Sequence, residues 1–171
     1  TAPEIVPRPE HTISRKQISD AALKVMRRLR EQGHIAYLAG GAVRDLLVGR
    51  TPKDFDIATD AHPEEIRRIF RNARLIGRRF RLAHIYFHGE IIEVTTFRAQ
   101  VDFDVADPSA HSHAVCSQEG MILRDNVYGN KDEDAMRRDF TVNALYYDIA
   151  DFSVHAYAGG WDDLQNRRLR L

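Results

Sequence analysis

Two aspartates separated by a single residue are the clearest chemical signal in this sequence. They are Asp54 and Asp56, within the segment Lys53-Asp54-Phe55-Asp56-Ile57. In an extended strand both would project from one face, while Phe55 and Ile57 would point into the core. Paired carboxylates suit hard cations such as Mg²⁺, and two such ions about 4 Å apart can assist phosphoryl transfer. The pair therefore predicts a two-metal phosphoryl-transfer site, and the alternative is two solvated acids at a strand edge.

A glycine turn lies about a dozen residues before the acidic pair, in Leu38-Ala39-Gly40-Gly41-Ala42-Val43-Arg44-Asp45. Here a buried strand is expected to meet a helix through Gly40 and Gly41. Glycines let backbone N–H groups approach a triphosphate, and a helix N-terminus favours anions. Arg44 lies one turn into the helix. The segment predicts a phosphate cradle that faces the metal site.

Two further acids are candidates for a third active-site carboxylate. Glu93 is a lone acid among β-branched residues, and such an acid needs a partner such as a metal or an arginine. Asp139 directly follows Arg137 and Arg138. Either acid could instead belong to a structural ion pair. Of the two arginines, we expect one to contact phosphate or ribose and the other to pair with a nearby acid.

A run of arginines without carboxylates is the one strongly basic stretch of the chain. Because the 25 Lys and Arg are balanced by 25 Asp and Glu, net charge gives no argument for a polyanionic partner. The local run predicts contacts with RNA or phosphate, above all at Arg78, Arg79 and Arg81. Its alternative is a solvated helix face followed by a basic turn. The run comprises Arg67, Arg68, Arg71, Arg74, Arg78, Arg79 and Arg81.

Composition indicates a globular protein that works in a reducing compartment. Hydrophobic residues make up 43% of the chain and charged residues 29%. The single cysteine, Cys116, excludes an internal disulfide framework and a multi-cysteine zinc site. No apolar run approaches the roughly 20 residues that span a bilayer. We therefore expect a cytoplasmic protein with no membrane association.

Hydrophobic periodicity predicts an α+β domain over residues 15–171, preceded by an extended, poorly ordered lead-in at 1–14. A helix over 14–32, capped by Ser14, begins the domain. A hairpin brings antiparallel strands into the core, and residues 98–117 read as a mobile loop. The expected strands are 35–39, 54–58, 82–87, 90–97, 154–157 and 168–171, and the expected helical segments are 42–48, 63–71, 132–149 and 161–164.

Several histidines and aromatic residues are expected to have ordinary structural positions. His84 and His88 flank a strand pattern and have no metal-ligand spacing with Cys116. Trp161, Tyr146 and Tyr147 could stack on a base, but we expect them to pack in the core.

With these motifs, the sequence resembles the class II nucleotidyltransferase family, which includes bacterial poly(A) polymerases and CCA-adding tRNA nucleotidyltransferases. The resemblance covers residues 35–170. It implies a head domain with a mixed, mostly antiparallel β-sheet and flanking helices. In intact members, neck, body and tail domains follow, and this chain lacks them. The matching motifs, in family order, are Leu38 to Asp45, Asp54-Phe55-Asp56, Ile92 to Arg98 and Arg137 to Leu145.

The resemblance also implies roles for individual residues. Asp54 and Asp56 would bind two catalytic Mg²⁺ ions, with ATP as the substrate. Asp139 would be an active-site acid, and Glu93 a possible third acid of the metal cluster. The nucleotide-binding candidates from the matching motifs are Gly40, Gly41, Arg44, Arg137, Arg138 and Asn143.

Within the family, residues 75–85 resemble the segment that distinguishes bacterial poly(A) polymerases. This favours addition of AMP from ATP to the 3′ ends of mRNA and other transcripts, with release of pyrophosphate. CCA addition to tRNA is the alternative. A catalytically silent nucleotide- or RNA-binding module is the alternative of another class, and it would be expected to lack an acid or Arg44, which this sequence retains. Whether the protein has protein partners is not indicated by the sequence.

Overall fold

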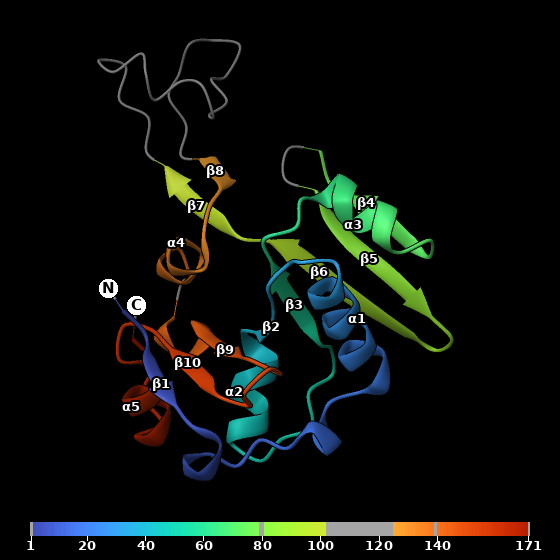
Figure 1. Cartoon of the computed structure of the whole chain (residues 1–171). Helices are drawn as coiled ribbons and strands as arrows, with labels where there is room; N and C mark the ends of the chain where they lie inside the picture. The colour runs from blue at the N-terminus through green and yellow to red at the C-terminus, as the bar shows by residue number, and fades with distance from the viewer. Residues whose placement is uncertain (1, 79–80, 102–124, 139, 171) are drawn as a thin grey trace, which may run out of the picture.

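The computed structural model describes residues 2–78, 81–101, 125–138 and 140–170, and an eight-stranded sheet forms its centre (Figure 1). The strand order is β1-β10-β9-β2-β3-β6-β5-β4. Neighbouring strands of this sheet are antiparallel, except that β3 pairs in parallel with β6. The strands are β1 (Glu4–Val6), β2 (Ala36–Ala39), β3 (Asp56–Thr59), β4 (Ala73–Ile76), β5 (Leu82–Phe87), β6 (Glu90–Thr96), β9 (Leu145–Tyr147) and β10 (Val154–Ala156).

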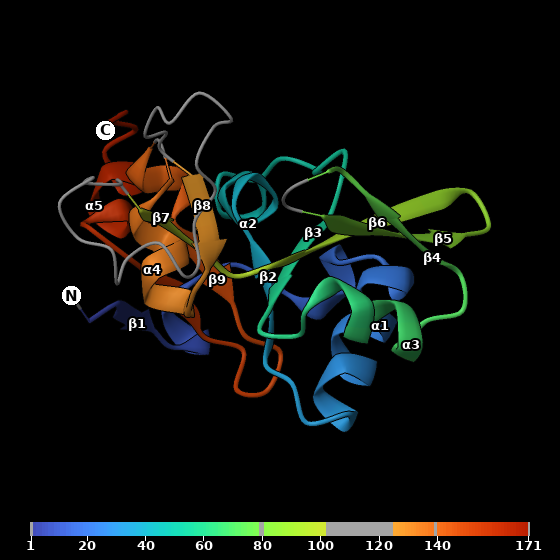
Figure 2. The same ribbon diagram turned by 90° about the horizontal axis from the view of Figure 1, so that it is seen from above.

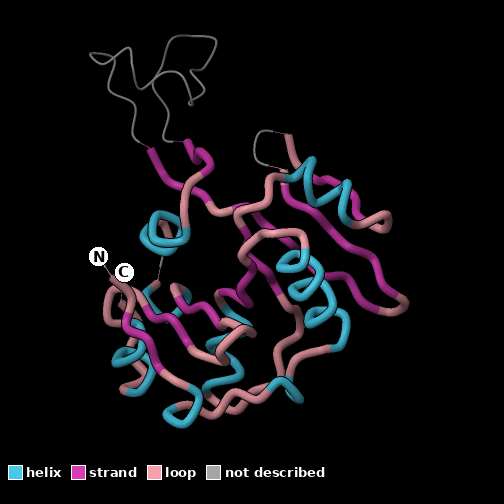
Figure 3. The backbone as a smooth tube through the Cα atoms, viewed as in Figure 1, coloured by secondary structure: helices cyan, strands magenta, loops and turns pink. Residues whose placement is uncertain are grey.

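Short helices and a separate two-stranded ribbon complete the domain, as the cyan and magenta segments of Figure 3 show. The predicted α+β class, with a mixed and mostly antiparallel sheet, is confirmed. The helices are α1 (Asp20–Glu31), α2 (Gly41–Leu47), α3 (Pro63–Ile69), α4 (Lys131–Met136) and α5 (Gly160–Gln165), with 3-10 turns at Arg8–Glu10, Arg15–Gln17 and Thr141–Asn143. The ribbon consists of β7 (Arg98–Val101) and β8 (Asp125–Tyr128).

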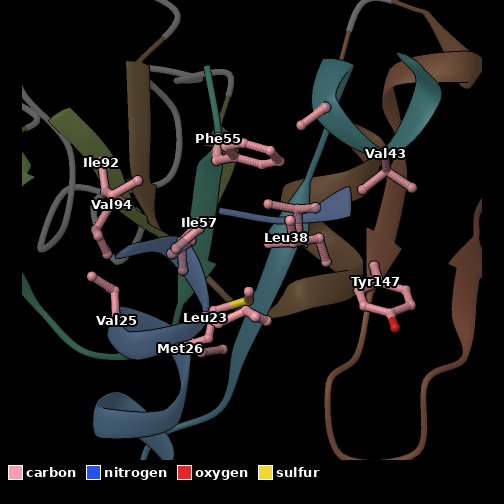
Figure 4. Packing of buried hydrophobic residues seen from close by; sticks show 14 of the residues in the cluster. Leu23, Val25, Met26, Leu38, Val43, Phe55, Ile57, Ile92, Val94 and Tyr147 are labelled. Carbon is pink, nitrogen blue, oxygen red and sulfur yellow. The ribbon is translucent and has the colours of Figure 1, made fainter. Parts of the chain in front are cut away.

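Helices α1 and α3 lie together on one side of the β6-β5-β4 end of the sheet (Figure 2). Buried Ile57, Ile92 and Val94 of the strands pack with Val25 and Met26 of α1 (Figure 4). A second core of mainly aromatic and alanine residues includes Ala135 of α4. In β2, β3 and β9, alternate side chains enter the first core and the second core, so both faces of these strands are covered.

Helix α1 begins later than its periodicity predicted. Ser14 caps the 3-10 turn that follows it, because its side chain and that of Gln17 form a reciprocal capping box. Ile18 is extended, and the hydroxyl of Ser19 then accepts from the N–H of Ala22 at 3.2 Å. The sequence thus contains two capping serines, Ser14 and Ser19, and the expected helix began at the first, whereas α1 begins after the second.

The expectation of a poorly ordered lead-in was wrong for Glu4–Val6, which forms a strand. Strand β1 pairs with β10 at the edge of the sheet, and Val6 is buried. The expected helical segment 132–149 was wrong at its end, since Leu145–Tyr147 forms β9. All three β9 residues are buried, so the strand shows no alternation that would separate it from a helix.

Other boundaries also differ from the expectations. Strand β3 begins at Asp56, so Asp54 precedes it. Strand β4, within the basic run, was not expected, and Arg168–Arg170 does not form a strand. The expected loop at 98–117 begins with strand β7, and its residues from 102 onward lie outside the described part of the chain. No helix in the described ranges is long and apolar enough to cross a membrane.

The central position of β3 makes its buried side chains important for stability. We predict that Ile57→Ala lowers the free energy of unfolding by about 3 kcal/mol, because it leaves a cavity beneath the acidic segment. Ile5→Ala, in edge strand β1 where the side chain is 49% exposed, is the matched control and should cost less than about 1 kcal/mol. Urea denaturation of both variants measures this, and equal losses would contradict the described packing.

Candidate active site

The parallel pairing of β3 with β6 brings acidic residues together. Asp56 lies directly opposite Glu93 in the register, and their side chains share a hydrogen bond. Asp54 lies two residues before Asp56, is exposed, and raises the pKa of Asp56 through its charge. Burial first, and then the charges of Glu93 and Asp54, raise the pKa of Asp56 to about 6. Such crowding of carboxylates suits a cation, which would compensate their repulsion.

Glu93 has a second neighbour on its other side. His84 of β5 is its antiparallel partner, and Nε2 of His84 lies 3.4 Å from Oε1 of Glu93. His84 was expected to be an ordinary strand-face residue, and it does lie on the strand face, but in contact with this acid. Glu93 thus lies between an acid and a histidine on the two neighbouring strands, and its charge also acts on Arg98.

The glycine turn is built around two arginines. Gly40 has a φ of +68°, and a Cβ there would lie 3.1 Å from Nη1 of Arg138, so glycine meets both the backbone and the packing requirement. A Cβ at Gly41 would lie 3.2 Å from Nη2 of Arg44. Arg44 in turn donates to Oδ1 of Asn143 at 2.8 Å. Arg44 and Asn143, which are 99 residues apart in the chain, therefore meet at this turn. We call Gly40, Gly41, Arg44, Arg138 and Asn143 the arginine cradle.

Register places the arginine cradle next to the acids. Leu38 of β2 pairs with Ile57 of β3, so the end of β2, where Gly40 follows, runs beside the start of β3. The charge of Arg138 also acts on Asp56, whose pKa it lowers against the larger effects of burial and neighbouring acids. The arginine cradle and the acids therefore lie at the same end of β2 and β3, and that they face one another as a phosphate cradle and a metal site stays a prediction.

One buried carboxylate holds both predicted arginines. The side chain of Asp134, in α4, is 1% exposed and accepts from Arg137 at 3.0 Å and from Arg138 at 2.9 Å. The hydroxyl of Tyr146 donates to the same carboxylate at 2.6 Å, and the backbone N–H of Arg98 donates at 3.0 Å. An acid was expected to pair with one of the two arginines, whereas Asp134 pairs with both; the expected contact of one arginine with phosphate or ribose stays a prediction.

The electrostatic state of Asp134 follows from these contacts. Burial opposes ionisation, but Arg138, Arg137 and the hydrogen bonds together hold the pKa of this carboxyl below its usual value. Sequence reasoning did not identify Asp134. A usable signal existed, since an acid three and four positions before two arginines on a helix is placed to pair with both.

The remaining candidates have less defined surroundings. Arg78 and Arg81 are exposed, and Arg81 lies 3.7 Å from Glu64 in an exposed ion pair. Arg79 and Asp139 lie outside the described residues. The expected packing of Tyr146 and Tyr147 in the core is confirmed, and Trp161 packs against it from a partly buried position.

A cavity of about 470 Å³ opens beside the acidic segment. It is lined by Lys53, Asp54 and Phe55 and by residues of the β5–β6 hairpin, including Glu90 and Ile91. The cavity gives access to Asp54 from solvent. It is large enough to hold several atoms of a substrate next to this carboxylate.

Within the described ranges, the group of side chains whose ligand atoms lie close enough to share one metal ion is not the set of Asp54, Asp56 and Glu93 but a different one. Oxygen atoms of Asp148 and Asp151 and a ring nitrogen of His155 lie within 4.8 Å of one another, near the β9–β10 turn. Nζ of Lys131 lies 2.5 Å from Nδ1 of His155, and Ser153 bridges His155 and Asp151. The lysine ammonium already supplies positive charge to this group. Sequence reasoning did not single it out.

Removal of the Asp134 charge should destabilise the domain. We predict that Asp134→Asn lowers the free energy of unfolding by about 3 kcal/mol at pH 7, because two partly buried guanidinium groups lose their common, buried partner. Because the folded pKa is depressed, the stabilisation exists above the unfolded pKa of about 4 and is lost as pH falls through the lower folded value. Urea titrations should show wild type and variant converging in acid.

Asp20→Asn, an exposed first-turn acid in α1, is the control for this comparison. It removes the same charge from a solvated position and should cost less than about 1 kcal/mol. If the two variants were equally stable at pH 7, the buried network would not anchor α4.

Comparison with known proteins places these motifs in a family. The poly A polymerase head domain family matches residues 36–170. The poly(A) polymerase I of Escherichia coli O157:H7 is 55% identical over 98% of this chain, and that of Haemophilus influenzae is 54% identical over 93%. The CCA-adding enzyme of Staphylococcus aureus strain Newman is 35% identical over 91%. The chain spans about a third of the length of these relatives, covering 35%, 34% and 35% respectively.

Solved structures show the same architecture. The Bacillus stearothermophilus CCA-adding enzyme, crystallised in complex with CTP, superposes with a TM-score of 0.68 at 33% identity, covering 87% of this chain and 32% of that one. The apo form II of a CCA-adding enzyme has a TM-score of 0.70 at 22% identity over 98% of this chain and 38% of the other, and supports the fold alone. Together, the motifs, fold and identities show that the chain belongs to the poly A polymerase head domain family.

Proposed function

We propose that this chain is the catalytic head of a template-independent RNA adenylyltransferase, which adds AMP from ATP to RNA 3′-hydroxyl groups. The observation that carries the proposal is the pairing of Asp56 with Glu93 beside the arginine cradle. Acids and arginines at one end of the central strands β2 and β3 supply the two types of charge that phosphoryl transfer needs. The acids would bind cations and the arginines would bind phosphates.

The arginine cradle would bind the triphosphate. Nη1 of Arg138 lies against the Gly40 turn, while Asp134 fixes its Nη2 and Tyr146 its Nε. Asn143 holds Nη1 of Arg44 next to Gly41. Because these side chains are already oriented, they can stabilise developing charge without large rearrangement. Their contacts support roles in nucleotide binding for Gly40, Gly41, Arg44, Arg137, Arg138 and Asn143.

Asp54 and Asp56 would hold two Mg²⁺ ions, with Glu93 as the third acid supporting the cluster. The donor set fits, since it consists of carboxylate oxygens, and burial together with the charges of Glu93 and Asp54 raises the pKa of Asp56. When bound, such ions would acidify the RNA hydroxyl and neutralise charge on the phosphates. Asp139 remains a proposed active-site acid on the basis of the family motif.

The proposed reaction makes one bond and breaks one. The RNA 3′ oxygen bonds to the α-phosphorus of ATP, the bond from that phosphorus to the bridging oxygen breaks, and pyrophosphate leaves. The hydroxyl proton passes to solvent. The protein contributes by positioning the reactants and stabilising charge, and no covalent enzyme intermediate is needed.

Poly(A) synthesis is favoured over CCA addition by the comparison with relatives. Identity to the poly(A) polymerases reaches 55%, against 35% for a CCA-adding enzyme over a similar length. The substrates would then be ATP and the 3′ ends of mRNA and other transcripts. Because ATP and transcripts are found in the cytoplasm, these substrates support a cytoplasmic location.

The deciding experiment supplies each of the four labelled nucleotides with an RNA primer and Mg²⁺ to the full-length natural protein. Extended tails of A alone are expected. Addition confined to C, C and A on tRNA-like ends would assign the sister activity. Failure of the folded, full-length protein to incorporate any nucleotide would favour a silent binding module and overturn the proposal.

Removal of either predicted metal ligand should abolish catalysis. We predict that Asp54→Ala and Asp56→Ala each reduce AMP incorporation by at least about 1,000-fold, because charge stabilisation at the reacting phosphate is lost. Asp162→Ala, which removes an exposed acid in α5, should retain wild-type activity. Incorporation at the wild-type rate by either metal-ligand variant would refute the assignment.

The same acidic crowding should reduce stability in metal-free buffer. Because the folded pKa of Asp56 lies near 6, above the unfolded value of about 4, its contribution favours folding at low pH and is lost as pH rises from about 4 to 6. Asp56→Asn should therefore melt a few °C above wild type at pH 7.5, and the difference should vanish near pH 4. Added Mg²⁺ should raise the Tm of wild type more than that of the variant. A lower Tm of the variant at pH 7.5 would contradict this.

A further inference from the structure

The sheet has an open face next to the acids. Along β5, Ala83 and Ile85 are buried in the core that α1 and α3 cover, whereas His84 and Tyr86 alternate with them and face the other way. Tyr86 is paired with Ile91 of β6, and the two are 38% and 47% exposed. In Figure 2, α1 and α3 lie on a single side of β4, β5 and β6. We call the outward side chains of these strands the open face.

An arginine and an aromatic ring are held in contact on the open face. The guanidinium carbon of Arg74 lies 5.5 Å from the ring centroid of Tyr86. The ring of His84 approaches Tyr86 edge-on, with centroids 6.4 Å apart. Asn72 fixes the backbone of Tyr86 through two hydrogen bonds, of 2.7 Å to its carbonyl and 3.0 Å from its N–H. The ring is thus exposed on a rigid strand.

The open face continues without interruption to the acidic cluster. His84, next to Tyr86 on this face, contacts Glu93 at 3.4 Å, and Glu93 is paired with Asp56. Strand spacing places Tyr86 about 12 Å from Asp56, measured across two strand intervals and along two residues. Ile91, the cross-strand partner of Tyr86, also lines the cavity beside Asp54.

We propose that the open face, centred on Tyr86 and Arg74, binds the single-stranded RNA segment that adjoins the reacting 3′ end. This inference rests on the proposed function. A base stacks on the Tyr86 ring, Ile91 adds apolar contact, and Arg74 contacts a backbone phosphate. Aromatic stacking tolerates any base, which suits a primer of variable sequence.

Charge supports RNA over a protein as the occupant. Strand β4 and the turn that follows it contribute the exposed cations Arg74 and Arg78, while Arg81 is paired with Glu64 of α3. A polyanion is attracted to such an edge, and its terminal hydroxyl is brought toward the acids where the cations required for reaction would lie. The open face thus matches both the charge and the direction of an incoming strand.

The test compares steady-state AMP incorporation by full-length wild type with that by Tyr86→Ala, Tyr86→Phe and Arg74→Ala, using an oligoadenylate primer. Tyr86→Ala is expected to raise the KM for primer by about 10-fold, with the KM for ATP unchanged, because one stacked base is lost. Tyr86→Phe, which keeps the stacking ring, should restore wild-type values. Arg74→Ala should weaken primer binding and reduce its dependence on salt. Arg27→Ala, at an exposed position of α1 on the covered side of the sheet, is the matched control and should leave the KM for primer unchanged.

Crosslinking gives a second measurement that does not depend on variants. A primer carrying 4-thiouridine near its 3′ end should crosslink to peptides of β5 and β6. An unchanged primer KM in Tyr86→Ala, a change confined to the KM for ATP, or crosslinks only elsewhere would each overturn the inference. These outcomes all require an active wild type, so they are distinct from failure of the proposed function, in which wild type itself incorporates no AMP.

Discussion

The register of the parallel pair β3–β6 determines the chemistry that this domain can perform. It places Asp56 opposite Glu93, with Asp54 two residues before, so that like charges share a partly buried site. A slip of one residue would turn these acids into the core and bring Ile57 and Val94 to the surface. The hydrophobic packing of α1 against the sheet therefore fixes the position of the acids as firmly as it fixes the fold.

The opposite charge is positioned by a separate device. Asp134 is buried and binds Arg137 and Arg138, and the latter reaches the Gly40 turn. A guanidinium group held by a carboxylate and a tyrosine hydroxyl loses less side-chain entropy when a phosphate binds. The domain thus combines acids whose repulsion favours cations with arginines that the α4 network orients, and the charge of Arg138 in this network also acts on Asp56.

The sequence was sufficient for the features that follow from local pattern. Alternation predicted the β5–β6 hairpin, and paired glycines predicted the turn at Gly40. Strand β9 was mistaken for helix because all of its residues are buried, which removes the period of two. The pairing of Asp56 with Glu93, and the convergence of Arg44 and Asn143, depend on long-range register that spacing does not encode. An acidic partner was expected for one of the two arginines, but the sequence did not single out Asp134 among the nearby acids, and that Asp134 binds both follows from the fold.

We propose that cations bind between the β3 acids and the arginine cradle. The most direct test is a crystal structure of the protein with Mn²⁺ and a non-hydrolysable ATP analogue, with the ions located by anomalous scattering. We expect anomalous peaks within coordination distance of Asp54 and Asp56, and triphosphate oxygens against Arg44 and Arg138. Peaks confined to the group near the β9–β10 turn, or a triphosphate bound away from the Gly40 turn, would contradict it.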